Sequence, residues 1–339
     1  MLTPDILIIA SENNDHAQAV QQYIETKRQN ISSFILDTSC LPCQISCNIS
    51  LNNDKVQITL PYVDENESLS FEKLRSIWWL EAGIPKLDPA LLQNKDHAHF
   101  AFLECGQLLE AIWYVQDCLW VNQPERQEIT LNPIYQLQAA KLAGFRILDT
   151  LVTSNAEALA DFWKKHQRHI TYRPMIPWDS SLNQFPEEYL HQSSAISSAP
   201  TLFQKSVLFK YCLLVVIIGD SIVPVQIYYK ENSAEPSFQS YNLPSEMKAK
   251  IQHLIKVVGL LYSIIEIGVD EKDNYIFVGI DPYAPFLEIE KQIKIPITER
   301  IAELLIGGKI RPTQTFWPTL GRIKQEQPKR FSQHKTTLP

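Results

Sequence analysis

The sequence predicts an α/β domain at the N-terminus, followed by an α+β body that contains an antiparallel sheet. The first observation is an opening order of strand, helix and strand, which is typical of a parallel α/β layer. The second is a series of long apolar strands in the second half, separated by short polar turns as in antiparallel sheets. The chain has 339 residues. That length is enough for roughly two or three domains.

The N-terminal domain is predicted from an apolar run at residues 5–10, which indicates a buried parallel strand. A helical pattern begins at Asp15 and extends to about residue 27. Three further strand patterns follow, at residues 33–37, 56–60 and 76–80. We expect this domain to end between residues 90 and 120.

The middle of the chain alternates between helices and strands. One helix is predicted over residues 97–119, where apolar residues recur on one face. A second helix has Pro133 in its first turn and Gly144 as its stop, which are favoured positions for these residue types. Asn155 is predicted to cap a third. Strand, helix and strand patterns lie around it, at residues 150–153, 156–166 and 170–172.

The second half begins with a stretch at residues 174–201 that is rich in Pro, Ser and Gln and is predicted to be an irregular loop. Three strands are then predicted to form one antiparallel sheet, at residues 202–207, 211–219 and 221–229. A helix at residues 244–259 has Gly259 as its stop. The chain closes with a hairpin and a final helix, at residues 262–269, 275–281 and 297–306.

Composition excludes several classes of function. The net charge of −7 gives no electrostatic basis for binding nucleic acid. The longest apolar run, residues 212–218, is far shorter than the roughly 20 residues of a membrane-spanning helix. The start shows no signal-peptide pattern, so we expect a cytoplasmic protein. Residues 311–339 are basic and polar and are expected to form a flexible tail.

Three of the six cysteines, Cys40, Cys43 and Cys47, stand close together in the stretch SCLPCQISC. This spacing raises the hypothesis of a metal or iron–sulfur site. However, no second pair of Cys or His occurs at zinc-finger spacing, so the pattern favours a loop that leads into a strand. The other three lie in apolar patterns and are predicted to be buried thiols.

Several long stretches carry a resemblance to a known family. In the first half they are ILIIAS with DHA, SIWWLEAGIP, and LWVNQPERQEITLNPIYQLQAAKLAGFRILDTLVTSN. In the second half they are LFQKSVLFKY, VVIIGDSIV, SYNLPSEM and GLLYSIIEIGVDEKDNYIFVGIDP. Together they cover about residues 5–308 and resemble the ATP-grasp proteins, in particular the ligases that crosslink microviridin-type peptides (graspetides).

The resemblance implies a pre-ATP-grasp α/β domain at residues 1–120 and an ATP-grasp core of two α+β subdomains, at residues 121–200 and 201–310. Such ligases join a carboxylate side chain to an amine or hydroxyl through an acyl phosphate. That chemistry needs cations on the nucleotide phosphates, divalent ions to bridge the phosphates, and carboxylates to hold the ions.

The positions that match the family's cations carry other residues here. Pro133 stands where the pattern Asn-Lys-x-x-Gln-Leu has its lysine, and Tyr172 matches a second lysine. Arg173 replaces that lysine only after a one-residue shift, which the alternation of side chains in a strand opposes. Leu214 stands for an arginine, and Lys205 for the glutamate that follows Phe-Gln at the hinge.

The metal site is changed as well. The family's last metal strand has the pattern Phe-Leu-Glu-x-Asn-Pro, so Gly279 replaces a glutamate and Asp281 an asparagine. Glu266 matches an aspartate of the same site, on the facing strand of one predicted hairpin. The resemblance therefore gives two vestigial sets of residues, with Glu266 and Asp281 for metal and Arg173, Gln204 and Lys205 for nucleotide.

Two hypotheses of function follow. In the first, which the lost cations favour, the chain is a pseudoenzyme without catalytic residues or cofactor that binds a peptide or protein partner. In the second it is an active, divergent ligase that uses ATP and Mg²⁺, with Arg173, Lys205 or Lys210 in place of the lost cations. The partner would be a precursor peptide or a companion ATP-grasp ligase, and the helix at residues 97–119 would suit a homodimer.

Overall fold

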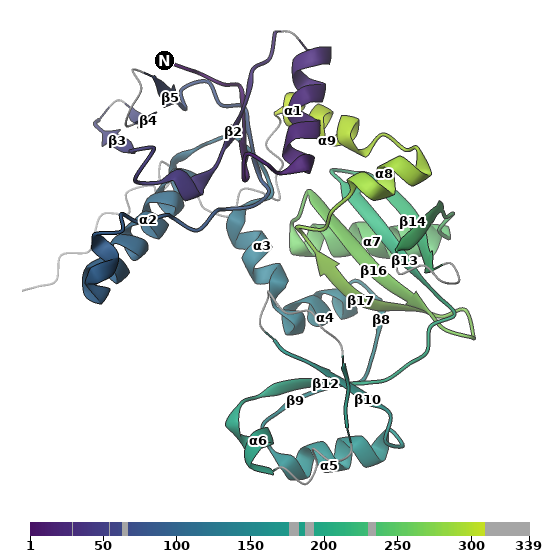
Figure 1. Ribbon diagram of the computed structural model, residues 1–339. Coiled ribbons are helices and arrows are strands. Elements are labelled where there is room, and N and C mark those ends of the chain that lie inside the picture. Colours follow the sequence, from purple (N-terminus) through teal and green to yellow (C-terminus); the bar gives the residue numbers. More distant parts are fainter. Residues whose placement is uncertain are drawn as a thin grey trace, which may run out of the picture.

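The computed structural model describes residues 1–28, 30–53, 55–62, 67–175, 183–186, 193–229 and 235–308. The predicted tail at residues 311–339 lies outside these ranges. Figure 1 shows a parallel sheet near the N-terminus, a small sheet with α5 at the bottom of the view, and a large sheet between them and to the right. No helix within the described ranges is both long enough and apolar enough to cross a bilayer.

The N-terminal domain is the predicted α/β layer. Its main sheet has the order β2-β1-β6-β7 with parallel pairing throughout, and its strands are β1 (Ile6–Ile9), β2 (Ser33–Leu36), β6 (Ser76–Trp79) and β7 (Leu119–Val121). Helix α1 (Asp15–Lys27) begins after Asn14, whose side chain accepts a hydrogen bond from the Ala17 amide. A second, antiparallel sheet contains β3 (Asn48–Leu51), β4 (Val56–Pro61) and β5 (Ser68–Ser70).

The helix predicted over residues 97–119 was too long. Helix α2 spans Lys95–Val115, and the apolar residues that follow it form strand β7 instead. Ser76 pairs with Leu119 and Trp78 with Val121, so β7 completes the parallel sheet beside β6. A short apolar run of this kind cannot be assigned to helix or strand from its periodicity alone.

The central part follows through two helices, α3 (Pro124–Leu131) and α4 (Pro133–Leu142), of which only the second was predicted. A small antiparallel sheet has the order β11-β10-β12-β9, and its strands are β9 (Thr150–Thr153), β10 (Ile170–Arg173), β11 (Asn183–Gln184) and β12 (Thr201–Lys205). One of its faces packs on α5 (Ala156–Lys165), which is capped by Asn155 as predicted.

Two predictions for this region were wrong. The strand expected at residues 202–207 does not join the sheet formed by residues 211–229, because β12 pairs with β9 and β10 in the small sheet. The stretch 174–201, expected to be irregular, contains β11 and the short helix α6 (Ser193–Ser198). Residues 176–182 and 187–192 of that stretch lie outside the described residues.

The large sheet is the predicted antiparallel sheet with one parallel edge strand, in the order β15-β14-β13-β16-β17-β8. The predicted hairpin is confirmed, since β16 pairs antiparallel with β17. Helix α7 ends at Gly259, which adopts the left-handed conformation with φ of 74°. The bounds are β8 (Arg146–Ile147), β13 (Tyr211–Ile218), β14 (Ser221–Tyr229), β15 (Pro236–Ser240), α7 (Ser245–Val258), β16 (Tyr262–Val269), β17 (Tyr275–Asp281), α8 (Leu287–Ile293) and α9 (Ile297–Gly307).

Both faces of the large sheet are covered, by different helices. On one face Ile265 and Ile267 belong to a core shared with α4 and α7. On the other face Tyr262 and Ile264 belong to a core that includes α9 and, from the N-terminal domain, α1. In Figure 1, α9 lies between α1 and the large sheet. The alternation along β16 therefore decides which of its side chains face each layer.

One buried amide, Asn122, joins the N-terminal sheet to the large sheet. It follows β7 directly, and its side chain is 1% exposed. Its Oδ1 accepts hydrogen bonds from the amides of Leu261 and Tyr262, at 2.7 and 2.9 Å. Its Nδ2 donates to the Tyr262 carbonyl at 2.8 Å. The start of β16 is thus fixed to the end of β7.

We predict that Asn122→Ala destabilises the protein by about 3 kcal/mol or more, because each buried polar group left without a partner costs roughly 1–3 kcal/mol. The measurement is the free energy of unfolding from urea titration. Asn155→Ala, which removes a helix cap at an exposed site, is the matched control and should cost about 1 kcal/mol. Equal losses in the two variants would mean that Asn122 does not secure this junction.

Candidate functional site

The two carboxylates expected at a metal site, Glu266 and Asp281, lie on one face of the hairpin. Glu266 pairs with Gly279, and Ile264 pairs with Asp281. The pairing shifts by a β-bulge between Glu266 and Ile267, and the side chains of β16 up to Glu266 still alternate between the two faces of the sheet. Because Ile264 faces the core beneath α9, Glu266, Gly279 and Asp281 all share that face. The structure therefore brings the two predicted ligands together, with Gly279 directly opposite Glu266.

Both carboxylates are recessed and yet reachable by solvent. Each side chain is exposed. Nevertheless, burial among surrounding protein atoms raises the pKa of Glu266 and that of Asp281 above their ordinary values. Asp281 also accepts a hydrogen bond from the Tyr283 amide at 2.8 Å, and this bond opposes the rise in its pKa. The two carboxylates are therefore accessible to solvent and also surrounded by protein atoms.

Arg173 at the end of β10, in the small sheet, lies near Glu266. Burial lowers its pKa, and the charge of Glu266 raises it; reciprocally, Arg173 lowers the pKa of Glu266. Nε and Nη2 of Arg173 are buried and donate no hydrogen bond within the described residues. Guanidinium donors in such a position are suited to an anion.

Tyr172, which matches the family's lysine, faces the opposite way. Its ring lies 6.1 Å from that of Phe185, edge to face, in the core beneath α5. Alternation along β10 consequently places Arg173, and not Tyr172, on the side of Glu266. A cation is thus present near the carboxylates, one residue away from the matched position.

Gln204 and Lys205 on β12 point to different sides. Thr171 and Gln204 are paired, so Gln204 shares a sheet face with Arg173. Its amide is buried and donates to Thr150 Oγ1 at 3.0 Å, which fastens β12 to β9. Lys205 is exposed on the other face, near Asp149, whose pKa is lowered mainly by a hydrogen bond from Lys165 and also by the charge of Lys205. The structure does not bring Lys205 to the carboxylates.

Gln136 is a site residue to which the sequence analysis gave no role. Its Nε2 donates to the Ile280 carbonyl at 2.9 Å, and its Oε1 accepts from the Ile280 amide at 3.1 Å. The side chain thereby replaces a neighbouring strand along the edge of β17, between Gly279 and Asp281. A polar residue within the buried part of α4 was the available signal. Pro133, three residues earlier, is buried at the first position of that helix.

The neighbours of Glu266 across the sheet are apolar. Leu214 stands directly opposite it on β13 and packs on the core that includes α9. Cys212 lies two residues away on the same face, where burial raises the pKa of its thiol to about 11. The ring of Phe209 covers Gly268, and a Cβ at that glycine would come within 2.3 Å of it. This part of the face is therefore filled by apolar groups.

The donors present among the described residues supply few of the ligands that a metal ion needs. The described residues contain no group of three or more His, Cys, Asp or Glu side chains placed to hold a metal ion. Cys40, Cys43 and Cys47 are free thiols. At the hairpin the protein supplies two carboxylates, and Mg²⁺ bound in this way needs phosphate oxygens to complete its octahedron.

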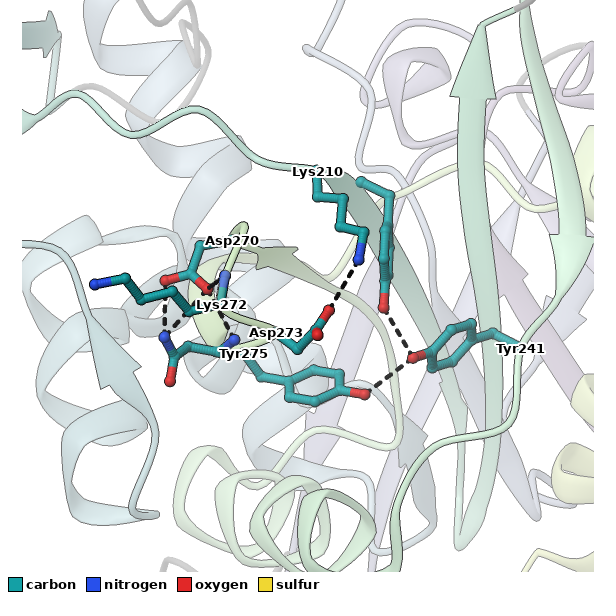
Figure 2. A network of polar contacts seen from close by, with 8 residues as sticks. Lys210, Tyr241, Asp270, Lys272, Asp273 and Tyr275 are labelled. Atoms are coloured by element: carbon teal, nitrogen blue, oxygen red, sulfur yellow. Dashed lines mark hydrogen bonds and ion pairs between the residues drawn. The ribbon is translucent and has the colours of Figure 1, made fainter.

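The turn of the hairpin is secured by a polar network on the other side of the sheet. The hydroxyl oxygen of Tyr241 lies 3.1 Å from that of Tyr211 and 2.9 Å from that of Tyr275. Figure 2 shows Tyr241 and Tyr275 pointing toward each other. The bond with Tyr241 raises the pKa of Tyr211 to about 12. Lys210 pairs with Asp273 in the turn at 3.2 Å. A cavity of about 600 Å³ lies beside this network, on the α7 side and away from Glu266.

The architecture is the ATP-grasp fold, with an α/β domain ahead of a core of two α+β subdomains. No known family model and no curated protein matches the sequence. Among solved structures, the macrocyclase MdnC from Microcystis aeruginosa, bound with its precursor peptide MdnA, is 21% identical with a TM-score of 0.78. The match covers 90% of this chain and 100% of that one.

Two other solved structures show the same likeness. An ATP-grasp ligase from Chryseobacterium gregarium, associated with RiPPs and in complex with ADP and a leader and core peptide, is 20% identical with a TM-score of 0.78. The match covers 91% of this chain and 97% of that ligase. The ligase PsnB, in complex with a variant of its minimal precursor, Mg and ADP, is 20% identical with a TM-score of 0.75. That match covers 91% of this chain and 99% of PsnB. At these identities the likeness establishes the fold.

We predict that Gly279→Glu lowers the free energy of unfolding at neutral pH by about 1–3 kcal/mol. A Cβ at Gly279 meets only Gln136 Oε1, at 3.6 Å, so the backbone accepts the side chain. The new carboxylate would lie opposite Glu266 and on the face of Asp281, and like charges disfavour one another. Millimolar Mg²⁺ should restore part of the loss, measured by thermal unfolding with and without the metal. Gly279→Gln is the uncharged control, and an equal response to Mg²⁺ in both variants would refute convergence of the carboxylates.

A second prediction concerns pH. Because the folded-state pKa values of Glu266 and Asp281 are raised above 4.5 and 3.8, these groups stabilise the fold when protonated. Their contribution is present below those ordinary values and is lost as pH rises through the folded pKa values. The double variant Glu266→Gln, Asp281→Asn should therefore gain stability relative to the wild type as pH rises from about 4.

Asp270→Asn is the control with the opposite sign. Hydrogen bonds from Asn274 lower the pKa of Asp270, so its contribution is present above its ordinary pKa and is lost on acidification. This variant should lose stability relative to the wild type as pH rises. Urea unfolding at several pH values measures both differences, and the same slope in the two variants would contradict the assignment for Glu266 and Asp281.

Proposed function

We propose that this ATP-grasp-fold protein is a pseudoenzyme that binds a peptide or protein partner and performs no ligase chemistry. One observation carries the proposal. The three positions that match the family's phosphate-binding cations are occupied by Pro133, Tyr172 and Leu214, and each of these side chains is packed against other protein groups. They cannot be recruited to a phosphate without disrupting the helix or core to which they belong.

The remaining charges support the same conclusion. Formation of an acyl phosphate requires cations at the transferring phosphoryl group, and one such group is worth roughly 2.7–4 kcal/mol in the transition state. Arg173 is a cation near the hairpin, and its charge interacts with that of Glu266. Lys205 lies on the opposite face of the small sheet. One arginine cannot supply what two lysines and an arginine supply in the family.

The donors at the hairpin are too few to hold Mg²⁺ without a bound nucleotide. The protein supplies two carboxylates, Glu266 and Asp281, so Mg²⁺ would need the phosphate oxygens of a nucleotide to complete its octahedron. Gly279 contributes no ligand. We therefore propose that neither ATP nor Mg²⁺ is a cofactor of this protein.

The proposed partner is a precursor peptide or a companion ATP-grasp ligase. Solved structures with this fold hold a precursor peptide in one case and a leader and core peptide in another, and these observations concern those proteins. For a protein partner or a homodimer, α2 offers Phe100, Leu103 and Tyr114, which are 65%, 50% and 53% exposed. A cytoplasmic location is proposed too, which agrees with six free cysteines.

The second candidate is an active, divergent ligase that uses ATP and Mg²⁺. Arg173 is the observation that favours it, because its buried Nε and Nη2 have no hydrogen-bond partner within the described residues and face Glu266. In this alternative the guanidinium would bind a phosphate, as the family's lysine does.

Nucleotide binding separates the two candidates. A ligand present at 100 times its dissociation constant stabilises the protein it binds by about 2.7 kcal/mol. We predict no rise in melting temperature with millimolar ATP and Mg²⁺, measured by differential scanning calorimetry. A rise that is lost in Arg173→Gln and kept in Lys205→Gln would contradict this prediction and favour the divergent ligase. Lys205 is the matched control because it lies on the other face of the same sheet.

A further inference from the structure

A second concave site lies where the N-terminal domain meets the large sheet. It is a cavity of about 300 Å³. Its floor is apolar and consists of Leu80, Ala284 and Phe286. Polar side chains complete the lining, and these are Asn14, His16, Glu81 and Tyr283. The three contributing segments are the start of α1, the end of β6 and the loop after β17.

The position of the cavity in the sheet favours ligand binding. β1 and β6 are neighbours in the strand order β2-β1-β6-β7. From the carboxyl end of β1 the chain continues toward β2 at one edge of the sheet, and from the carboxyl end of β6 it continues toward β7 at the other edge. Such a switch point is where open α/β sheets bind their ligands. The amides of Leu80 and Glu81 both donate to the Ile9 carbonyl, at 3.1 and 2.9 Å, and hold the turn after β6 in place.

The wall of the cavity is rigid. Phe286 is 1% exposed, and its ring lies 4.7 Å from that of His16 and 6.1 Å from that of Tyr262. The hydroxyl of Tyr262 donates to the Ala284 carbonyl at 2.6 Å. Tyr262 in turn is held by Asn122, so the cavity is formed before any ligand arrives.

The polar lining has acceptor groups and a negative charge. Glu81 is the charged residue of the lining, and its Oε2 accepts from Asn14 Nδ2 at 3.3 Å. Nδ1 of His16 is buried and has no hydrogen-bond partner within the described residues. Asp281, bonded to the Tyr283 amide, adds a second carboxylate two residues from the lining. This environment attracts a cation with hydrogen-bond donors.

The size of the cavity restricts the ligand. Ligand pockets span roughly 300–1,000 Å³, so this one is at the lower limit and suits one side chain better than a nucleotide. An apolar floor with a carboxylate at the rim is complementary to a long aliphatic stem that ends in a charged group. Lysine has this combination, because its methylene stem packs on apolar surface while its ammonium stays at the polar edge.

We propose that this cavity binds a lysine side chain of the peptide partner, with the stem on Leu80 and Phe286 and the ammonium donating to Glu81. The inference rests on the proposed peptide-binding function. Tyr283 is two residues from Asp281, a span of at most about 7 Å along the chain. A peptide held here by one lysine therefore lies beside the carboxylates of the hairpin.

The test uses the full-length protein and a defined probe, Nα-acetyl-lysine methylamide. Binding is followed by NMR of ¹³C-labelled alanine methyl groups, where Ala284 in the cavity should shift and Ala302, buried in α9, should not. The norleucine analogue has the same stem without the charge and should bind at least about tenfold more weakly. Equal binding of the two probes, or no shift at Ala284, would overturn the proposal.

Two glutamate variants locate the interaction. Glu81→Gln keeps the shape of the side chain and should weaken the lysine probe about tenfold, because it removes a charged hydrogen-bond acceptor. Glu25→Gln is the matched control, an exposed glutamate on α1 about 15 Å from Asp15 along the same helix, and should leave the affinity unchanged. Equal effects of the two variants would mean that bulk charge, and not the cavity, attracts the probe.

The outcome is independent of the nucleotide experiment. A protein that binds ATP and also shows Glu81-dependent lysine binding would refute the pseudoenzyme proposal and retain the cavity assignment. A protein that binds neither ATP nor the lysine probe would refute the cavity assignment alone.

Discussion

The buried side chain of Asn122 accepts two hydrogen bonds and donates one, and these three bonds connect the two sheets on which every candidate site depends. Asn122 ends the last strand of the parallel sheet, and its partners begin β16. Glu266 stands four residues further along β16, and the ring of Tyr262 packs against Phe286 in the floor of the cavity lined by Leu80 and Phe286. A shift of this junction would move the carboxylates relative to Arg173, and the same shift would open the cavity. Its strength follows from burial, since water cannot replace the lost partners.

A second buried amide, Gln136, performs a similar task at the edge of β17. Both amides bind backbone groups and neither requires a nucleotide, so they stabilise the hairpin whatever chemistry its face carries. The apolar cores on the two sides of the large sheet are also independent of the site. This separation explains how Pro133, Leu214 and Gly279 can occupy the family's functional positions within an unchanged ATP-grasp architecture.

Much of the fold was predictable, because long periodic segments such as α1, α7 and the hairpin carry their own turn and capping signals. The failures involve partners distant in sequence. Leu119–Val121 is a strand because β6 is available beside it, and β12 belongs to the small sheet because β9 and β10 pair with it. Glu266 and Asp281 were predictable from the resemblance and the period of two. The direction of Arg173 and the cavity were not, since each depends on segments that meet only in the folded chain.

The charges around the hairpin connect the two proposals. In a ligase, carboxylates face a polyphosphate across divalent ions, and cationic side chains offset the remaining repulsion. Here Arg173 stands near Glu266, Asp281 shares the face of Glu266, and Glu81 lines the neighbouring cavity. A nucleotide polyanion would meet net repulsion on this surface, whereas the basic side chain of a peptide would meet attraction. If the protein is the proposed pseudoenzyme, the replacement of the lysines by Pro133 and Tyr172 does more than remove catalysis. It changes the charge of the ligand that this surface favours, from an anionic phosphate to a cation.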